Sequence, residues 1–352
     1  MKRSTKRVGI IGTVVGLAAA GVAAGVATER YLVRRHRRGE DPYADEPFSD
    51  RPFDESRVVR TDDGVDLYLE IVDGDPTLTL VFIPGYGLDM GTFYFQRKAF
   101  AGEYRSVFYD QPGHGRSGRL PSGDYTMEAL GAALRRVIEA TAPTGRIVLI
   151  GHSMGGMTVM ALAEQWPEVF AERVAGAVLI STSAGELDEV SFGLPEVVAR
   201  FRRPLIPLVR TGGQITATMI DRARRATTDL AWLLTRRYGF GSEHPSPALV
   251  SFVERMNSST STDTVARYLR TLYAHSRLLL LNPLADVPVL IICGDHDLLT
   301  PLAHSREIAG VLPEAELVVI EDGGHVALLE QSELVNAALD GFLQKVATDR
   351  LG

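Results

Sequence analysis

The sequence predicts an α/β fold, with a doubly wound and mostly parallel sheet and an inserted helical cap. Predicted strands and helices alternate along the chain, which is typical of a parallel sheet covered by helices. The apolar runs "LTLVFIPG" and "RIVLI" fit strands that are buried on both faces of such a sheet. The alternation stops between residues 184 and 284, where apolar residues recur at helical spacing without a clear strand.

The elements follow in a regular order. "RVVRTDDGVDLYLEIVDG" predicts a β-hairpin that turns at residues 62–64. We expect further strands at "LTLVFIPG", "YRSVFYD", "RIVLI", "RVAGAVLI", "VPVLIICG" and "AELVVIE", and helices near residues 91–101, 126–140, 155–165, 303–311 and 334–346. The core then comprises residues 57–183 and 285–352, and residues 184–284 form a cap over the C-terminal edge of the sheet.

The N-terminal region, residues 1–38, is predicted to anchor the chain in a membrane. Residues 8–28 carry no charged side chain. As a helix they would span roughly 31 Å, close to the ~30 Å hydrocarbon core of a bilayer. The alternative is a secretory signal that is cleaved near residues 25–27. The acidic, proline-containing segment 39–56 is predicted to be a linker that buries little surface.

Charge and cysteine content exclude several classes of function. Residues 1–38 hold nine Lys/Arg and one Glu, a net charge of +8, so the remainder of a chain of net charge −7 carries −15. This acidic body argues against nucleic-acid binding. The single cysteine, Cys293, excludes an internal disulfide and a thiolate metal cluster. No cofactor or metal is predicted, and the sequence indicates no oligomeric state.

The pentapeptide Gly151-His152-Ser153-Met154-Gly155 lies between a buried strand and a predicted helix. A G-x-S-x-G sequence in this context makes a sharp turn that exposes the serine hydroxyl at a helix N-terminus. The glycines prevent clashes where backbone segments approach closely. The sequence therefore predicts a nucleophilic serine.

A serine hydroxyl needs a base, and the base needs a third group to orient it. "IICGDHDLLTP" places Asp295 and Asp297 just after a predicted strand, and "VVIEDGGHVALLE" places His325 in the loop after the next strand. The chain order serine, aspartate, histidine is the order expected for this type of turn. His296 lies between the two acids, but three consecutive residues rarely converge on one metal ion.

The motifs "FIPGYG", "YDQPGHGRSG", "GHSMGG", "GDHDLLTP" and "GGHVALLE" together resemble the α/β-hydrolase fold family, in its capped branch with a serine nucleophile. The resemblance covers residues 57–350. It implies that Ser153 is the nucleophile and His325 the general base. The acid of the family lies three positions after the strand-ending glycine, which selects Asp297, with Asp295 as the rival.

The resemblance also implies an oxyanion hole formed by the backbone N–H groups of Tyr86 and Met154. One feature departs from the family pattern, because Pro84-Gly85 stands where the family usually has His-Gly. A backbone donor can survive this change, but the hydrogen bonds of that histidine must be replaced.

These features predict a membrane-tethered serine hydrolase that cleaves a small-molecule or lipid carboxylic ester through an acyl-enzyme. The same triad could serve a thioesterase, a carbon–carbon hydrolase or a haloperoxidase/perhydrolase. From another class, a non-catalytic membrane-anchored binding module stays open. Nine arginines between residues 200 and 237 suggest either solvated helix faces or a basic lid that lies on anionic lipid.

Overall fold

The computed structural model describes residues 41–121, 124–187, 190 and 228–348. Its centre is an eight-stranded sheet of order β1-β2-β4-β3-β5-β6-β7-β8, in which β3 to β8 are parallel and β1 and β2 are antiparallel. The strands are β1 (Glu55–Arg60), β2 (Asp66–Val72), β3 (Asp75–Ile83), β4 (Tyr104–Tyr109), β5 (Arg146–His152), β6 (Val174–Ile180), β7 (Val289–Gly294) and β8 (Glu316–Ile320). The predicted mostly parallel sheet and the hairpin of β1 and β2 are confirmed.

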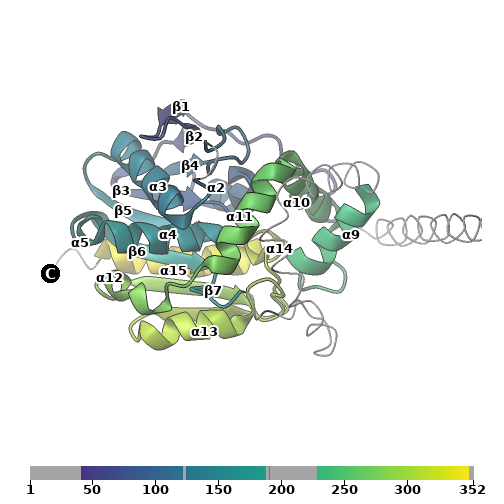
Figure 1. The fold of residues 1–352 in the computed structure, drawn as a ribbon. Helices are drawn as coiled ribbons and strands as arrows, with labels where there is room; N and C mark the ends of the chain where they lie inside the picture. The colour runs from purple at the N-terminus through teal and green to yellow at the C-terminus, as the bar shows by residue number, and fades with distance from the viewer. Residues whose placement is uncertain (1–40, 122–123, 188–189, 191–227, 349–352) are drawn as a thin grey trace, which may run out of the picture.

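Helices cover both faces of the sheet (Figure 1). One face packs against α3 (Met127–Thr141), α4 (Met154–Gln165) and α13 (Leu302–Val311), and the other packs against α2 (Tyr94–Ala99) and α15 (Ser332–Thr348). In β3, the side chains of Val81 and Ile83 pack on the face covered by α3, α4 and α13. Those of Leu80 and Phe82 pack on the opposite face. This explains the continuous apolar run, because successive side chains of a strand point to opposite faces. Shorter helices are η1 (Met90–Phe93), α5 (Pro167–Arg173), η3 (Leu278–Leu280), α12 (Asn282–Ala285) and α14 (Ala327–Glu330).

Of the described helices between β6 and β7 in the chain, three lie at one edge of the sheet and form the cap: α9 (Thr228–Gly239), α10 (Pro247–Ser259) and α11 (Thr262–Ala274) (Figure 1). The Trp232 indole N–H of α9 donates to the Ser251 hydroxyl of α10 at 3.0 Å. The Tyr268 hydroxyl of α11 donates to the Pro112 carbonyl, in the loop after β4, at 3.1 Å. Most of the arginine-rich segment 200–237 lies outside the described residues, so its lipid-binding role stays a hypothesis.

The segment before β1 differs from the predicted linker at one aromatic side chain. The linker predicted over residues 39–56 is described from residue 41, and most of its side chains are exposed, but Phe48 is only 6% exposed and stacks on Phe252 of α10 with ring centroids 4.5 Å apart. Asp41 accepts hydrogen bonds from the Ser246 hydroxyl and the Ala248 N–H at the start of α10. Acidic residues dominate the composition of this segment, but its few aromatic side chains determine how it packs. Phe48 contacts Phe252 of the cap and Tyr94 of the core, so the segment joins the two.

The predicted membrane segment, residues 8–28, lies outside the described residues and stays a prediction. Within the part of the chain that the structure describes, no helix has the length and apolar character needed to cross a membrane.

Three buried histidines are held in their neutral form. Burial lowers the pKa of His114 to about 4 and that of His275 to about 4. Burial, followed by the nearby His325, lowers the pKa of His152 to about 3. The opposite shift occurs at Asp110, where burial, followed by the neighbouring Asp89, raises the carboxyl pKa to about 7. These groups make the stability of the fold depend on pH.

We predict that the free energy of unfolding falls as the pH drops from about 6.5 toward 5. The histidines bind more protons when unfolded, so each loses stabilising free energy through this window. Asp110 acts in the opposite direction, since its carboxyl keeps a proton in the folded state and its contribution is lost as the pH rises toward its folded pKa. Unfolding at pH 5 should therefore take up about two protons net, so the free energy of unfolding should fall steeply as the pH drops.

Urea denaturation of the full chain at several pH values between 5 and 6.5 measures this slope. His275→Gln keeps a side-chain donor for the Ser183 carbonyl. We expect this variant to take up about one proton fewer than the native chain when it unfolds. A slope of zero in the native chain, or an unchanged slope in the variant, would contradict the assignment.

Candidate active site

Ser153 lies at the turn between β5 and α4, in a backbone conformation that few non-glycine residues adopt. Its φ is +53° and its ψ is −118°. The turn is held from both sides, because the Ser153 N–H donates to the Ile180 carbonyl at 2.9 Å and the Thr182 hydroxyl donates to the Ser153 carbonyl at 2.7 Å. A Cβ on Gly155 would lie 2.0 Å from the Ile83 carbonyl oxygen. Glycine is therefore required where α4 begins against β3.

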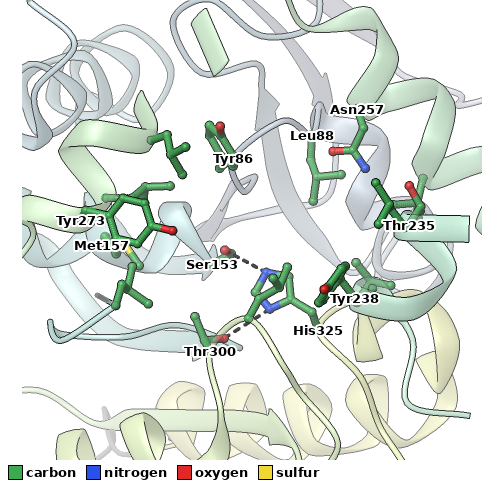
Figure 2. A pocket seen from close by; sticks show the side chains of 18 residues that line it. Tyr86, Leu88, Ser153, Met157, Thr235, Tyr238, Asn257, Tyr273, Thr300 and His325 are labelled. Carbon is green, nitrogen blue, oxygen red and sulfur yellow. Dashed lines mark hydrogen bonds between the residues drawn. The ribbon is translucent and has the colours of Figure 1, made fainter. Parts of the chain in front are cut away.

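The structure brings the three predicted side chains together. The Ser153 Oγ lies 3.0 Å from His325 Nε2, and His325 Nδ1 lies 2.9 Å from Asp297 Oδ2 (Figure 2 shows the serine and the histidine). With the Nδ1 proton donated to the carboxylate, Nε2 is the acceptor for the serine hydroxyl. All three residues are 9% exposed or less. The arrangement allows a proton to pass from the serine to the imidazole.

Asp297 is anchored by four donors. Its Oδ1 accepts from the N–H groups of Leu299 and Thr300, and its Oδ2 accepts from the Thr300 hydroxyl and from His325. Burial alone would raise the pKa of this carboxyl, but the His325 imidazole and the Thr300 donors outweigh it and keep the pKa below its usual value. The carboxylate therefore stays ionised beside the imidazole.

The structure also separates the two acids that the sequence left as rivals. Asp295 is exposed, whereas Asp297 is 3% exposed and contacts the imidazole. The sequence reasoning missed Thr300, whose hydroxyl lies 3.2 Å from His325 Nδ1 as well as bonding Asp297. Its place three residues after the acid was the only available signal.

The loop that carries Tyr86 passes directly over the serine. A Cβ on Gly85 would lie 2.9 Å from His152 Nδ1 and 3.1 Å from Ser153 Cβ, so the loop can approach only because this residue is glycine. His152 is fully buried, and its Nε2 lies 2.8 Å from the His325 carbonyl oxygen. His152 thus packs between the loop and the segment that carries His325, and its Nε2 faces the His325 carbonyl rather than the serine hydroxyl.

Two side chains from the loop after β4 hold the Tyr86 loop in place. The Gln111 amide donates to the Pro84 carbonyl at 2.6 Å, and His114 Nε2 accepts from the Gly87 N–H at 3.0 Å. Gln111 also accepts from the Thr158 hydroxyl of α4 at 3.0 Å. Gln111 and His114 therefore supply hydrogen bonds to a loop that lacks the usual family histidine at position 84.

A cavity of about 310 Å³ opens above the serine. Its walls are mainly aliphatic, aromatic and thioether side chains from the core loops, α4 and the three cap helices (Figure 2). Apart from His325, none of its lining residues carries an ionisable acid or base other than tyrosine, within the part of the chain that is described. Small-molecule sites are typically of this size, and mostly apolar with a few polar groups.

Several known proteins are similar to this chain. The chain is 27% identical over 277 residues to the dihydrolipoyllysine-residue acetyltransferase component of an acetoin cleaving system from Pseudomonas putida. The match covers 77% of this chain, but the chain spans only 65% of the length of that relative.

Among solved structures, the chain is similar to a thermophilic esterase from Thermogutta terrifontis, with 26% identity, a TM-score of 0.61, and coverage of 84% of this chain and 100% of the esterase. It shares its fold with an enol-lactonase from Burkholderia xenovorans, with 24% identity, a TM-score of 0.65, and coverage of 82% and 100%. Residues 79–332 match the alpha/beta hydrolase fold family. The chain therefore belongs to the alpha/beta hydrolase fold family.

Proposed function

We propose that this protein is a serine hydrolase that cleaves carboxylic esters with an apolar acyl group. The observation that carries the proposal is the continuous contact from Ser153 Oγ through His325 to the buried Asp297 carboxylate, at the floor of an apolar cavity. Membership of the hydrolase family and the likeness to an esterase support the same reaction class.

In the proposed reaction, Ser153 Oγ attacks the ester carbonyl carbon while His325 Nε2 takes the hydroxyl proton. The tetrahedral intermediate collapses, the bond to the leaving oxygen breaks, and His325 gives its proton to the leaving alcohol. Water then attacks the acyl-enzyme, with His325 again taking and returning a proton. The acid is released and the serine hydroxyl is restored.

The negative oxygen of the intermediate needs donors, and we assign them to the backbone N–H groups of Tyr86 and Met154. Met154 opens α4 directly after the serine, where helix N–H groups lack intrahelical partners. Tyr86 follows Gly85, which packs against the serine. Gln111 contacts both regions, because it donates to the Pro84 carbonyl, two residues before Tyr86, and accepts from the Thr158 hydroxyl, one helical turn after Met154.

The first prediction concerns the reaction itself. The full chain should hydrolyse p-nitrophenyl esters from C2 to C16 with an optimum set by the cavity, because a longer acyl chain fills more apolar surface until the space ends. Ser153→Ala should lower kcat by roughly 10⁴-fold or more. Turnover that survives in Ser153→Ala would contradict the assignment of the nucleophile.

A second prediction uses the two neighbouring acids as a matched pair. Asp297→Asn should lower kcat by roughly 10⁴-fold, because an amide no longer stabilises the imidazolium or selects its tautomer. Asp295→Asn should stay within about twofold of the native chain, since its side chain is exposed. Steady-state kinetics on one ester measures kcat for both variants. An equal fall in kcat in Asp297→Asn and Asp295→Asn would overturn the choice of Asp297.

The third prediction concerns Gln111, which holds the loop of Tyr86 in place. Gln111→Met keeps the side-chain length but removes both hydrogen bonds, so kcat should fall on the order of 10- to 100-fold with little change in KM. The pH profile should keep its shape because Asp297 and His325 are untouched. Gln165→Met in α4, away from the serine, is the matched control and should retain native kinetics. A loss confined to KM in Gln111→Met would contradict a role at the oxyanion donors.

A further inference from the structure

The loop of residues 321–326, which we call the histidine loop, lies between a backbone segment of the cap and one of the core. On the cap side, a Cβ on Gly324 would lie 2.3 Å from the nitrogen of Gly241, in the loop that follows α9. On the core side, a Cβ on Gly294, at the end of β7, would lie 2.0 Å from the Gly323 carbonyl oxygen. The histidine loop is therefore packed backbone to backbone on both sides, so a displacement of the loop after α9 must displace it.

Glu330, the last residue of α14, joins these two loops through its carboxylate. Its Oε2 accepts from the Gly324 N–H at 2.9 Å and from the Gly241 N–H at 3.0 Å, and its Oε1 accepts from the Ser242 N–H at 2.9 Å. One donor belongs to the histidine loop, and two belong to residues 240–242, which we call the cap loop. Hydrogen bonds to an ionised carboxylate are stronger than those to a neutral acceptor. Glu330 therefore holds the two loops firmly against each other.

The residues on either side of His325 are both bonded through these contacts. The residue before it, Gly324, donates its N–H to Glu330. The residue after it, Val326, donates its N–H to the Gly239 carbonyl, at the end of α9, at 2.9 Å. The end of α9 leads directly into the cap loop. The backbone at His325 is therefore held to the same part of the cap on both sides.

This support matters because the imidazole has to contact two partners at once. His325 Nε2 lies 3.0 Å from Ser153 Oγ, and His325 Nδ1 lies 2.9 Å from Asp297 Oδ2. Proton transfer requires that both distances are kept, and a displacement of about 1 Å can lower the rate about 100-fold. We propose that Glu330 is a positioning residue for His325, which aligns the base by holding the cap loop against the histidine loop. The assignment rests on the proposed function, in which His325 is the general base.

The contacts of Glu330 give it a role in alignment and not in the chemistry. The three donors to its carboxylate are backbone N–H groups, and neither Glu330 nor Gly241 is among the described residues that line the cavity. A glutamine in its place has one acceptor oxygen and an NH₂ group, which would face an N–H group instead of accepting from it. Glu330→Gln therefore breaks the contact between the loops while it keeps the size of the side chain.

Glu330→Gln and Gly241→Ala test the proposal from the two sides of this contact. In the full chain, each should lower kcat on p-nitrophenyl hexanoate about 10- to 100-fold and leave KM within about threefold. Gly241→Ala keeps the carboxylate but adds a Cβ that would lie 2.3 Å from the Asp322 carbonyl oxygen. A loss in both variants therefore reports the position of the loops and not the charge. The double variant should lose little more than either single variant, because both changes break the same contact.

Two controls match these changes. Glu333→Gln removes the same charge from an exposed side chain in the first turn of α15. Gly341→Ala adds a Cβ in α15 that meets nothing within 4 Å in the described structure. Both should keep kcat and KM within about twofold of the native chain. Urea denaturation of every variant establishes that the assayed protein is folded.

A His325→Gln background separates the alignment of the base from general support of the site. In that background Glu330→Gln should leave the residual hydrolysis within about twofold, because no base remains to be aligned. A further loss of about tenfold or more there would overturn the assignment. Native kcat in Glu330→Gln or in Gly241→Ala, or a loss confined to KM, would overturn it as well.

The rate at which a fluorophosphonate labels Ser153 is a second readout that needs no ester. It should fall together with kcat in Glu330→Gln and Gly241→Ala, because His325 must also activate the serine for this reaction. If the native chain is labelled but hydrolyses no ester, the proposed ester cleavage fails, and the labelling rates still decide the role of Glu330. Equal labelling rates in the native chain and both variants would contradict that role.

Discussion

The close packing of α4 against β3 is the constraint on which the rest of the site depends. Gly155 lies so near the Ile83 carbonyl that no side chain fits, and the chain must turn sharply at Ser153, with its φ at +53°. Strained backbone of this kind persists only where the surroundings hold it. Here the Ile180 carbonyl and the Thr182 hydroxyl hold the turn. The turn places the Ser153 hydroxyl in the cavity, at the start of α4.

Everything else in the site is arranged around that fixed hydroxyl by loops at the C-terminal ends of parallel strands, as expected for open α/β sheets. The loop after β7 carries Asp297, the loop after β8 carries His325, and the loop after β3 carries Tyr86. Neighbouring loops support them, and the most informative support is Gln111, which bonds both the Pro84 carbonyl and Thr158. The cap contributes walls that are bonded separately to the histidine loop and to the Tyr86 loop.

The sequence predicted those parts of the molecule that depend on local patterns. Apolar runs identified the strands, and the glycines around Ser153 identified the turn. The structure brings Asp297 and His325 to the serine, as the motifs at the strand ends predicted. The parts that could not be predicted depend on contacts between distant residues.

The segment before β1 is one example, because its acidic composition hid the stacking of Phe48 on Phe252, some two hundred positions away in the chain. The replacement of the missing family histidine by Gln111 and His114 is another, since nothing near Pro84 in the sequence indicates it.

The central claim is that Ser153 is an activated nucleophile, and covalent labelling tests it without any assumption about the substrate. Treating the full chain with a fluorophosphonate and locating the adduct by peptide mass spectrometry is the most direct measurement. The account predicts a single adduct on Ser153, and loss of labelling in His325→Gln while the variant remains folded. A folded native chain that does not react, or that reacts at another serine, would contradict it.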